Sequence, residues 1–243
     1  MKLVFIRHGD PNYELDTLTP TGWEEAEILS DRVCKMDVKA FYCSPLGRAR
    51  DTAKATLEKL GRTAEVLPWL QEFPAKVRHT WKDAPHVIWD MLPRDMAAEP
   101  RYYHPEQWLE VPFFAEAGVP ALYREVCQEL DKLLSQYGYD RDGLLYKATR
   151  PNEDTLVFFC HFGLECVLLS HLLHVSPMVL WHGFCAAPTS ITTVITEERR
   201  EGIASWRTWC FGDTSHLYAA GREPSDSARF CEMLSNPVIR IDC

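Results

Sequence analysis

The sequence has no long apolar run. Its richest apolar stretch, residues 167–180, is interrupted by polar residues and a proline, whereas a membrane-spanning helix needs roughly 20 consecutive apolar residues. The apolar start of the chain is too short for a signal peptide, because Arg7, His8 and Asp10 interrupt it. We therefore expect a cytoplasmic protein with no membrane partner.

The chain also lacks an excess of basic residues. Lys and Arg number 26 against 35 Asp and Glu, which gives a formal net charge of −9. Proteins that bind nucleic acid or anionic membranes regardless of sequence need a basic surface, so we expect no nucleic-acid partner. The charge leaves room for a small, local anion site.

Cysteine pairs at metal-binding spacing are missing as well. The nine cysteines are an odd number at irregular intervals, and no C-x-x-C pair occurs. Zinc sites show regular cysteine spacing, and reduced thiols are typical of the cytosol. The sequence thus predicts reduced cysteines, no metal and no cofactor.

What the chain does contain is an alternation of short apolar strands and amphipathic helices. Its 243 residues are 46% hydrophobic and 25% charged, as in soluble globular proteins. The patterns predict helices that begin near Thr21, Ser44 and Gly163, the first two capped by those side chains. The expected strands are residues 2–6, 39–43, 64–67, 155–160, 190–196 and 203–210. This alternation predicts an α/β protein with three layers, in which helices cover both faces of a mostly parallel central sheet.

The middle of the chain, residues 73–151, follows a different pattern. It is largely helical, most clearly over 120–137, and carries many of the aromatic residues. We interpret it as an insertion that forms a lid, within a single domain spanning residues 1–243.

The most informative motif is Arg7-His8-Gly9, directly after the first strand. Loops at strand ends converge on one crevice in an open α/β sheet. A histidine there can act as a nucleophile, an arginine can hold an anion, and a glycine lets the backbone approach a ligand closely. His161 follows the strand 155–160 in the same way.

Four segments together resemble the histidine phosphatase superfamily, also called the phosphoglycerate mutase-like family. They are the R-H-G turn, LTPTG at residues 18–22, SPLGRARDTA at 44–53 and FFCHFG at 158–163. The resemblance extends over about residues 1–72 and 155–195 and does not include the middle segment. It implies a phosphoglycerate mutase-like fold. It also implies an enzyme, a metal-independent hydrolase of small phosphorylated metabolites that works through phosphohistidine.

The resemblance implies roles for four residues around the phosphoryl group. His8 matches the nucleophile, and Arg7, Arg48 and His161 match the residues that surround the phosphoryl oxygens. Arginine suits this task because its planar guanidinium donates parallel hydrogen bonds and stays charged. His161 contributes most when protonated, and a neighbouring dianion favours that form. Arg50 points to another side of its helix and receives no role.

A proton donor is needed as well, because an alkoxide is a poor leaving group. The family often places this acid in an L-x-E pattern, which Leu70-Gln71-Glu72 matches. Glu72 is therefore our candidate for the general acid, and later for the base that activates water. Asp10 is the alternative, although its charge would repel the phosphoryl group, and capping or orienting the turn is the more usual task of such a residue.

Further substrate contacts are expected from Gly9, Asn12, Thr21, Gly22 and Phe162. Asn12 lies closer to His8 than the family's pattern places its asparagine. Thr21 and Gly22 match a phosphate-binding turn but equally fit a plain helix cap. Phe162 either narrows the pocket or packs beneath it. The insertion is expected to contact the leaving group through residues such as Trp108.

Two other functions are compatible with the same motifs. One is a cofactor-dependent phosphoglycerate mutase, disfavoured because the mutase-type continuation of R-H-G is missing. The other is a catalytically inactive module that binds a phosphorylated ligand. The acid phosphatase and phytase branch is set aside, because no His-Asp dipeptide occurs and Pro11 replaces its second arginine. The sequence specifies neither the substrate nor the oligomeric state.

Overall fold

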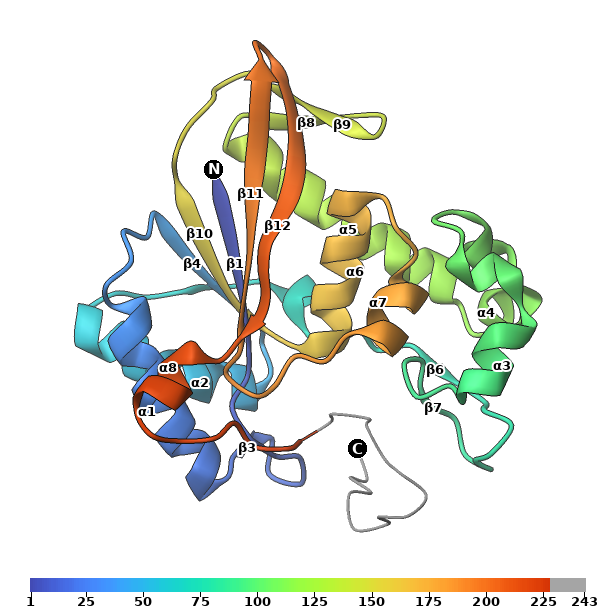
Figure 1. Ribbon diagram of the computed structural model, residues 1–243, viewed down its shortest axis with the longest axis horizontal. Helices are drawn as coiled ribbons and strands as arrows, with labels where there is room; N and C mark the ends of the chain where they lie inside the picture. Colours follow the sequence, from blue (N-terminus) through green and yellow to red (C-terminus); the bar gives the residue numbers. More distant parts are fainter. Residues whose placement is uncertain (228–243) are drawn as a thin grey trace.

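The fold is built on one large mixed sheet, and the computed structural model describes residues 1–227 (Figure 1). The sheet has eight strands in the order β5-β4-β10-β1-β11-β12-β9-β8. Their bounds are β1 Lys2–Arg7, β4 Ala40–Cys43, β5 Glu65–Val66, β8 Tyr139–Asp142, β9 Leu145–Ala148, β10 Thr155–Cys160, β11 Ile191–Arg200 and β12 Ile203–Asp213. Two small pairs lie outside it, β2 Pro11–Asn12 with β3 Thr17–Leu18 and β6 Lys76–Val77 with β7 His86–Val87.

The sheet has a parallel half and an antiparallel half. Strands β5, β4, β10 and β1 are parallel neighbours, whereas every pair from β1 to β8 through β11, β12 and β9 is antiparallel. The predicted α/β class with a sheet between helices is confirmed, and the sheet is mixed. The antiparallel half is larger than expected because the β8–β9 hairpin joins it at one edge.

Helices cover both faces of this sheet (Figure 1). The α-helices are α1 Pro20–Val33, α2 Gly47–Leu60, α3 Pro93–Ala98, α4 Pro112–Glu116, α5 Val119–Gln136, α6 Phe162–Leu173, α7 Pro177–Gly183 and α8 Ser215–Ala219. Short 3₁₀ turns are η1 Pro68–Leu70, η2 Pro100–Tyr103 and η3 Gln107–Glu110. In Figure 1 the helices α1, α2 and α8 lie on one side of the sheet, and α5, α6 and α7 lie on the other.

Strand β1 shows how the sequence builds two cores. Leu3 and Phe5 belong to the larger core under α5 and α6, and Val4 and Ile6 to the smaller core under α1 and α2. Successive side chains of a strand point to opposite faces, so a continuous apolar run is what a strand covered on both faces requires.

Two helix starts differ from the sequence expectation. Helix α1 is capped by Thr19, whose hydroxyl accepts from Gly22 N at 3.1 Å, and not by Thr21. Helix α2 begins at Gly47 after Leu46, so Ser44 is not its cap. Serine is a common cap, but the Ser44 hydroxyl is used elsewhere, as described below.

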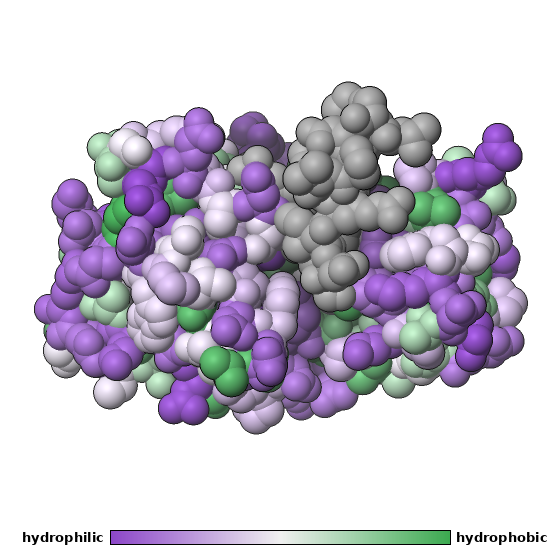
Figure 2. All heavy atoms as spheres, turned by 90° about the horizontal axis from the view of Figure 1, so that it is seen from below, coloured by the Kyte–Doolittle hydropathy of each residue, from purple (hydrophilic) through white to green (hydrophobic). Residues whose placement is uncertain are grey.

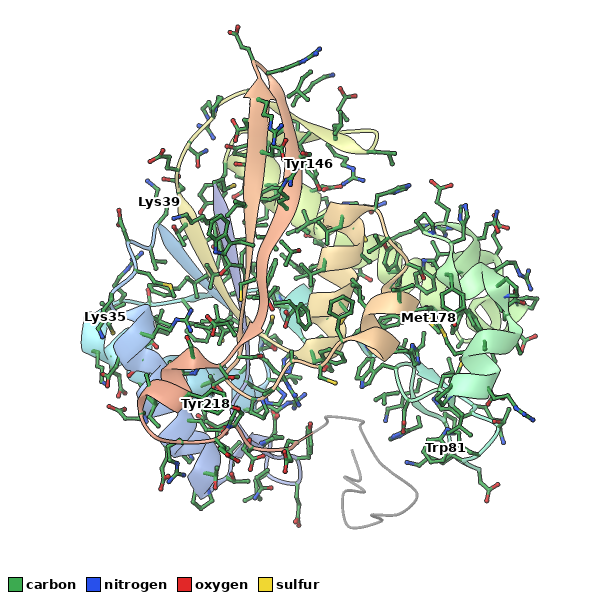
Figure 3. All side chains as sticks on the ribbon, in the orientation of Figure 1. Lys35, Lys39, Trp81, Tyr146, Met178 and Tyr218 are labelled. Atoms are coloured by element: carbon green, nitrogen blue, oxygen red, sulfur yellow. The ribbon has the colours of Figure 1, made fainter. Side chains whose placement is uncertain are left out.

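The middle segment, residues 73–151, has two parts, one outside the main sheet and one that belongs to it. Its first part holds the β6–β7 pair and the short helices, and the buried ring of Trp108 there packs against Phe114 and Trp181. Met178 on α7 lies between α7 and these helices, while Trp81 lies at the lower edge of the molecule (Figure 3). Its second part supplies α5 and the β8–β9 hairpin to the main fold. That residues 73–151 act as a lid stays a prediction.

Among residues 1–227, no helix combines the length and the apolar character that crossing a membrane would need.

Candidate active site

Three neighbouring parallel strands end in polar side chains at the same edge of the sheet. β1 pairs with β10 so that Arg7 lies opposite Cys160, and β10 pairs with β4 so that Phe159 lies opposite Cys43. The residue that follows each strand is His8 after β1, His161 after β10 and Ser44 after β4. This edge faces the lower side of the molecule in Figure 1, and Figure 2 shows that side to be mainly hydrophilic.

His8 is fixed as a neutral imidazole. It is 2% exposed, and its Nδ1 lies 2.8 Å from its neighbour's carbonyl oxygen, Gly9 O. Burial lowers the pKa of His8 well below its usual value, and the charges of Arg7 and Arg48 lower it further. The Nδ1 proton donates to the carbonyl, which leaves the lone pair on Nε2. A neutral ring with a fixed tautomer is what a nucleophile needs.

The R-H-G turn packs backbone against backbone on the start of α1. A Cβ on Gly9 would lie 2.8 Å from Gly22 O, and a Cβ on Gly22 would lie 2.2 Å from Asp10 O. Gly9 N also donates to Thr52 Oγ1 at 2.9 Å, which ties the turn to α2. The two glycines therefore hold His8 in place by close approach.

We expect Gly22→Ala to destabilise the protein by roughly 2 kcal/mol, because overpacking against backbone cannot be relieved by a rotamer change. Denaturant unfolding measures the loss. Gly183→Ala is the matched control, since a Cβ there meets nothing within 4 Å. Equal unfolding midpoints for the two variants would contradict the packing described here.

Arg7 is almost completely buried and held by backbone carbonyls. Its side chain is 2% exposed, and Nη1 donates to Ala186 O at 2.5 Å and to Ser227 O at 3.0 Å. Its Nε has no hydrogen-bond partner within residues 1–227. The planar guanidinium is thus oriented by the two hydrogen bonds that Nη1 donates.

Arg48 lies at the start of α2 and is paired with a carboxylate from the β2–β3 turn. Its Nη1 donates to Asp16 Oδ1 at 2.6 Å, and Gly47 N donates to Asp16 Oδ2 at 2.7 Å. The guanidinium also lies 5.3 Å from the centre of the Tyr13 ring. These contacts fix the direction of the Arg48 side chain, which is only 11% exposed.

His161 faces His8 and is anchored by Ser44. The two imidazole centres are 5.2 Å apart, and His161 Nε2 lies 2.7 Å from Ser44 Oγ. Burial lowers the pKa of His161 well below its usual value, with His8, Arg48 and Arg7 adding to the effect. The ring is therefore neutral at neutral pH, and a bound dianion would raise its proton affinity. Its Nδ1 has no partner within the described residues.

Glu72 lies at the N-terminus of α6, where its carboxyl accepts hydrogen bonds from backbone N–H groups. Its Oε1 accepts from Phe73 N at 2.8 Å and from Leu164 N at 2.9 Å, and its Oε2 from Gly163 N at 3.3 Å. Burial raises the pKa of Glu72, while these N–H groups and Arg48 oppose the shift. A raised pKa makes the carboxyl a better proton donor near neutral pH.

The other residues expected in the site have more local surroundings. Asn12 Oδ1 accepts from Leu15 N in the β2–β3 turn, and Thr21 is exposed on α1. Gly22 is buried against Asp10, and Phe162 lies in the larger core. Among these positions only Gly9 belongs to the turn that carries His8.

Several residues of this cluster were not recognised from the sequence. Ser44 and Thr52 lie within the SPLGRARDTA segment, so that motif was the available signal for both. Asp16 contacts Arg48 across 32 positions of the chain, and Ser227 contacts Arg7 across 220. No local pattern marks such distant partners.

The arrangement can bind an oxyanion and attack it. The charges of Arg7 and Arg48 act on the neutral His8, and the ring of His161 lies 5.2 Å from it between centres. Arg7 Nε, Arg48 Nε and His161 Nδ1 are buried nitrogens without a hydrogen-bond partner within residues 1–227. Planar cationic donors of this kind match phosphoryl oxygens. No group of three or more metal-ligating side chains occurs in the part of the chain that the structure describes.

Comparison with known proteins identifies the family. A model described as "Histidine phosphatase superfamily (branch 1)" matches residues 3–208. No curated protein matches the sequence.

Solved structures with a similar fold include three phosphatases. A mutant phosphoserine phosphatase from Entamoeba histolytica, in complex with phosphoserine, has a TM-score of 0.58 at 22% identity, covering 89% of this chain and 98% of that one. A mycobacterial glucosyl-3-phosphoglycerate phosphatase has a TM-score of 0.55 at 19% identity, covering 88% and 99%. The α-ribazole phosphatase of Shigella flexneri has a TM-score of 0.54 at 20% identity, covering 88% and 96%. At these identities the likeness shows the fold.

Proposed function

The chain belongs to the histidine phosphatase superfamily, and we propose that it hydrolyses phosphate monoesters of small metabolites through a phosphohistidine on His8. The observation that carries this proposal is the neutral, buried His8, whose Nδ1 is bonded to Gly9 O. Nε2 is then the nucleophilic atom, and Arg7, Arg48 and His161 stand around it. The similar structures named above include phosphatases of small metabolites, which supports this substrate class.

In the first step the phosphoryl group moves to the enzyme. Arg7, Arg48 and His161 Nδ1 hold the phosphoryl oxygens, and His8 Nε2 forms a bond to phosphorus as the bond to the leaving oxygen breaks. Most of the catalysis is positioning and charge stabilisation, because the phosphoryl oxygens stay negative throughout. The proton that the leaving oxygen needs comes from Glu72, whose raised pKa suits it to that task.

In the second step water releases the phosphate. Glu72, now a carboxylate, takes a proton from the water molecule as the water oxygen attacks phosphorus. The bond from phosphorus to Nε2 breaks, which returns a neutral His8 and frees inorganic phosphate. No redox partner or metal enters either step.

A panel of phosphorylated metabolites, assayed for free phosphate with and without EDTA, tests this function. Sugar phosphates, phosphoglycerates, nucleotides and phosphoserine form the panel. We expect phosphate release from at least one of them at a rate that EDTA does not change.

Three results would contradict the proposal. Loss of activity on chelation would overturn the metal-independent mechanism. Interconversion of phosphoglycerates in the presence of a trace of bisphosphoglycerate, without free phosphate, would favour the mutase. Binding of phosphorylated compounds without turnover of any of them would favour an inactive module.

A further inference from the structure

A short stretch near the end of the described chain, residues 224–227, contacts the site directly. We call it the strap. It follows α8 and begins at Pro224, which is buried. Ser225 N, Ser227 Oγ and Ser227 O each hydrogen-bond to a group around the R-H-G turn.

Glu25 joins the strap to the turn. This glutamate on α1 is only 2% exposed, and no cation pairs with it among the described residues. Its Oε2 accepts from Asp10 N at 3.0 Å, and its Oε1 accepts from Ser225 N at 3.0 Å. Burying a carboxylate is costly unless its oxygens are hydrogen-bonded, and here the strap supplies one of those bonds.

Asp10 makes the second connection. Its Oδ2 accepts from Thr19 Oγ1 at 2.6 Å, and its Oδ1 accepts from Ser227 Oγ. Both oxygens are therefore engaged in holding the strap and the start of α1 to the turn. These bonds give Asp10 a structural task, in keeping with its position directly after the R-H-G turn.

The strap ends on Arg7. The two hydrogens of Nη1 go to Ala186 O and Ser227 O, while Nη2 and Nε make no hydrogen bond within residues 1–227. A guanidinium is planar, so fixing Nη1 between two carbonyls fixes the direction of the other nitrogens. One of those carbonyls comes from the loop before β11 and the other from the strap.

We propose that the strap is a positioning element of the active site, which orients Arg7 for the phosphoryl group and is anchored by Glu25 and Asp10. The inference rests on the proposed function only in taking Arg7 as an anion-binding residue. Ser227 O of the strap accepts from Arg7 Nη1, the same nitrogen that donates to Ala186 O. Arg7 Nη2 and Nε therefore stay available for the ligand. It therefore supports binding and does not compete with it.

Ser225→Pro tests the strap in the full chain, because it removes the N–H that donates to Glu25. Glu223→Pro is the matched control, since that backbone N–H makes no hydrogen bond within the described residues. Calorimetric titration with inorganic phosphate and with orthovanadate gives the affinity without requiring turnover. We expect Ser225→Pro to weaken binding about tenfold, and Glu223→Pro to change it less than twofold.

The same titrations in an Arg7→Ala background show whether the strap acts through Arg7. There we expect Ser225→Pro to have less than a twofold further effect, because coupled residues are not additive. An equal loss in both backgrounds would overturn the proposal, and so would tighter binding in Ser225→Pro, which would make the strap an inhibitor.

A milder variant guards against misfolding. Ser227→Ala removes the hydroxyl that donates to Asp10 but keeps the carbonyl on Arg7, so we expect a twofold to threefold loss of affinity. Affinity unchanged in both Ser227→Ala and Ser225→Pro would contradict the role of the strap. Phosphate binding is measured directly, so a protein without phosphatase activity can still show the coupling between the strap and Arg7, and an active protein can lack it. Failure of this proposal and failure of the proposed function are therefore distinguishable.

Discussion

His8→Ala is expected to lower phosphate release at least about 10³-fold, because removing a nucleophile abolishes the covalent route. The ring nearest to His8, that of His161, lies 5.2 Å away between centres, with its Nε2 engaged with Ser44, and in the proposed mechanism its Nδ1 donates to the phosphoryl oxygens. Steady-state release of phosphate from the best substrate of the panel measures the loss.

Chemical trapping shows whether the loss concerns the nucleophile itself. Phosphorus bonded to an imidazole nitrogen is stable to base and labile to acid, so an alkaline quench of the wild-type reaction should retain label on the protein. His8→Ala should retain none. His174→Asn is a suitable control, because it removes an imidazole outside the site at a position with φ of 54°, which asparagine tolerates. A wild-type rate in His8→Ala would overturn the nucleophile assignment.

The sequence was informative where a candidate site residue lies next to its strand. Arg7, His8 and His161 directly follow apolar runs, and the parallel pairing of β1 with β10 brings these residues together. The ends of β1 and β10 could therefore be placed from pattern alone. The clustering of these side chains is a consequence of register.

Prediction was less successful where a local pattern had two readings. Ser44-Pro45 has the form of a helix start, yet the hydroxyl of Ser44 contacts His161 across 117 positions. The antiparallel half of the sheet was underestimated for a related reason. The β8–β9 hairpin lies in the middle segment, and nothing in its few residues indicates that it pairs with β12.

Glu165 is expected to make the protein less stable as pH rises from about 4.5 to about 7. This residue of α6 is 0% exposed, and neither carboxylate oxygen has a hydrogen-bond partner within residues 1–227. Burial raises the pKa of Glu165 to about 7, with Glu72 adding to the effect and Thr192 and Arg7 opposing it. The Thr192 side chain lowers the pKa of Glu165, although it makes no hydrogen bond with the carboxyl.

The direction of the pH effect follows from proton binding. In the unfolded chain this carboxyl loses its proton near 4.5, whereas in the native protein it keeps the proton to about 7. Between these values the native state binds more protons, so the free energy of unfolding falls as pH rises. The stabilisation is complete below about 4.5 and is lost as pH passes 7, a change of roughly 3 kcal/mol from the shift.

Denaturant unfolding of the wild type and Glu165→Gln at pH 5 and pH 8 measures this change. Glutamine cannot ionise, so the variant should gain stability relative to the wild type by about 2 to 3 kcal/mol between the two pH values. In the difference between the two proteins, the contributions of all other titrating groups to the free energy of unfolding cancel. Glu58→Gln is the control, because that side chain is 69% exposed and should show no such gain. Parallel pH profiles for the wild type and Glu165→Gln would mean that Glu165 is already ionised in the folded protein at pH 5, and that Arg7 and Thr192 outweigh the cost of its burial.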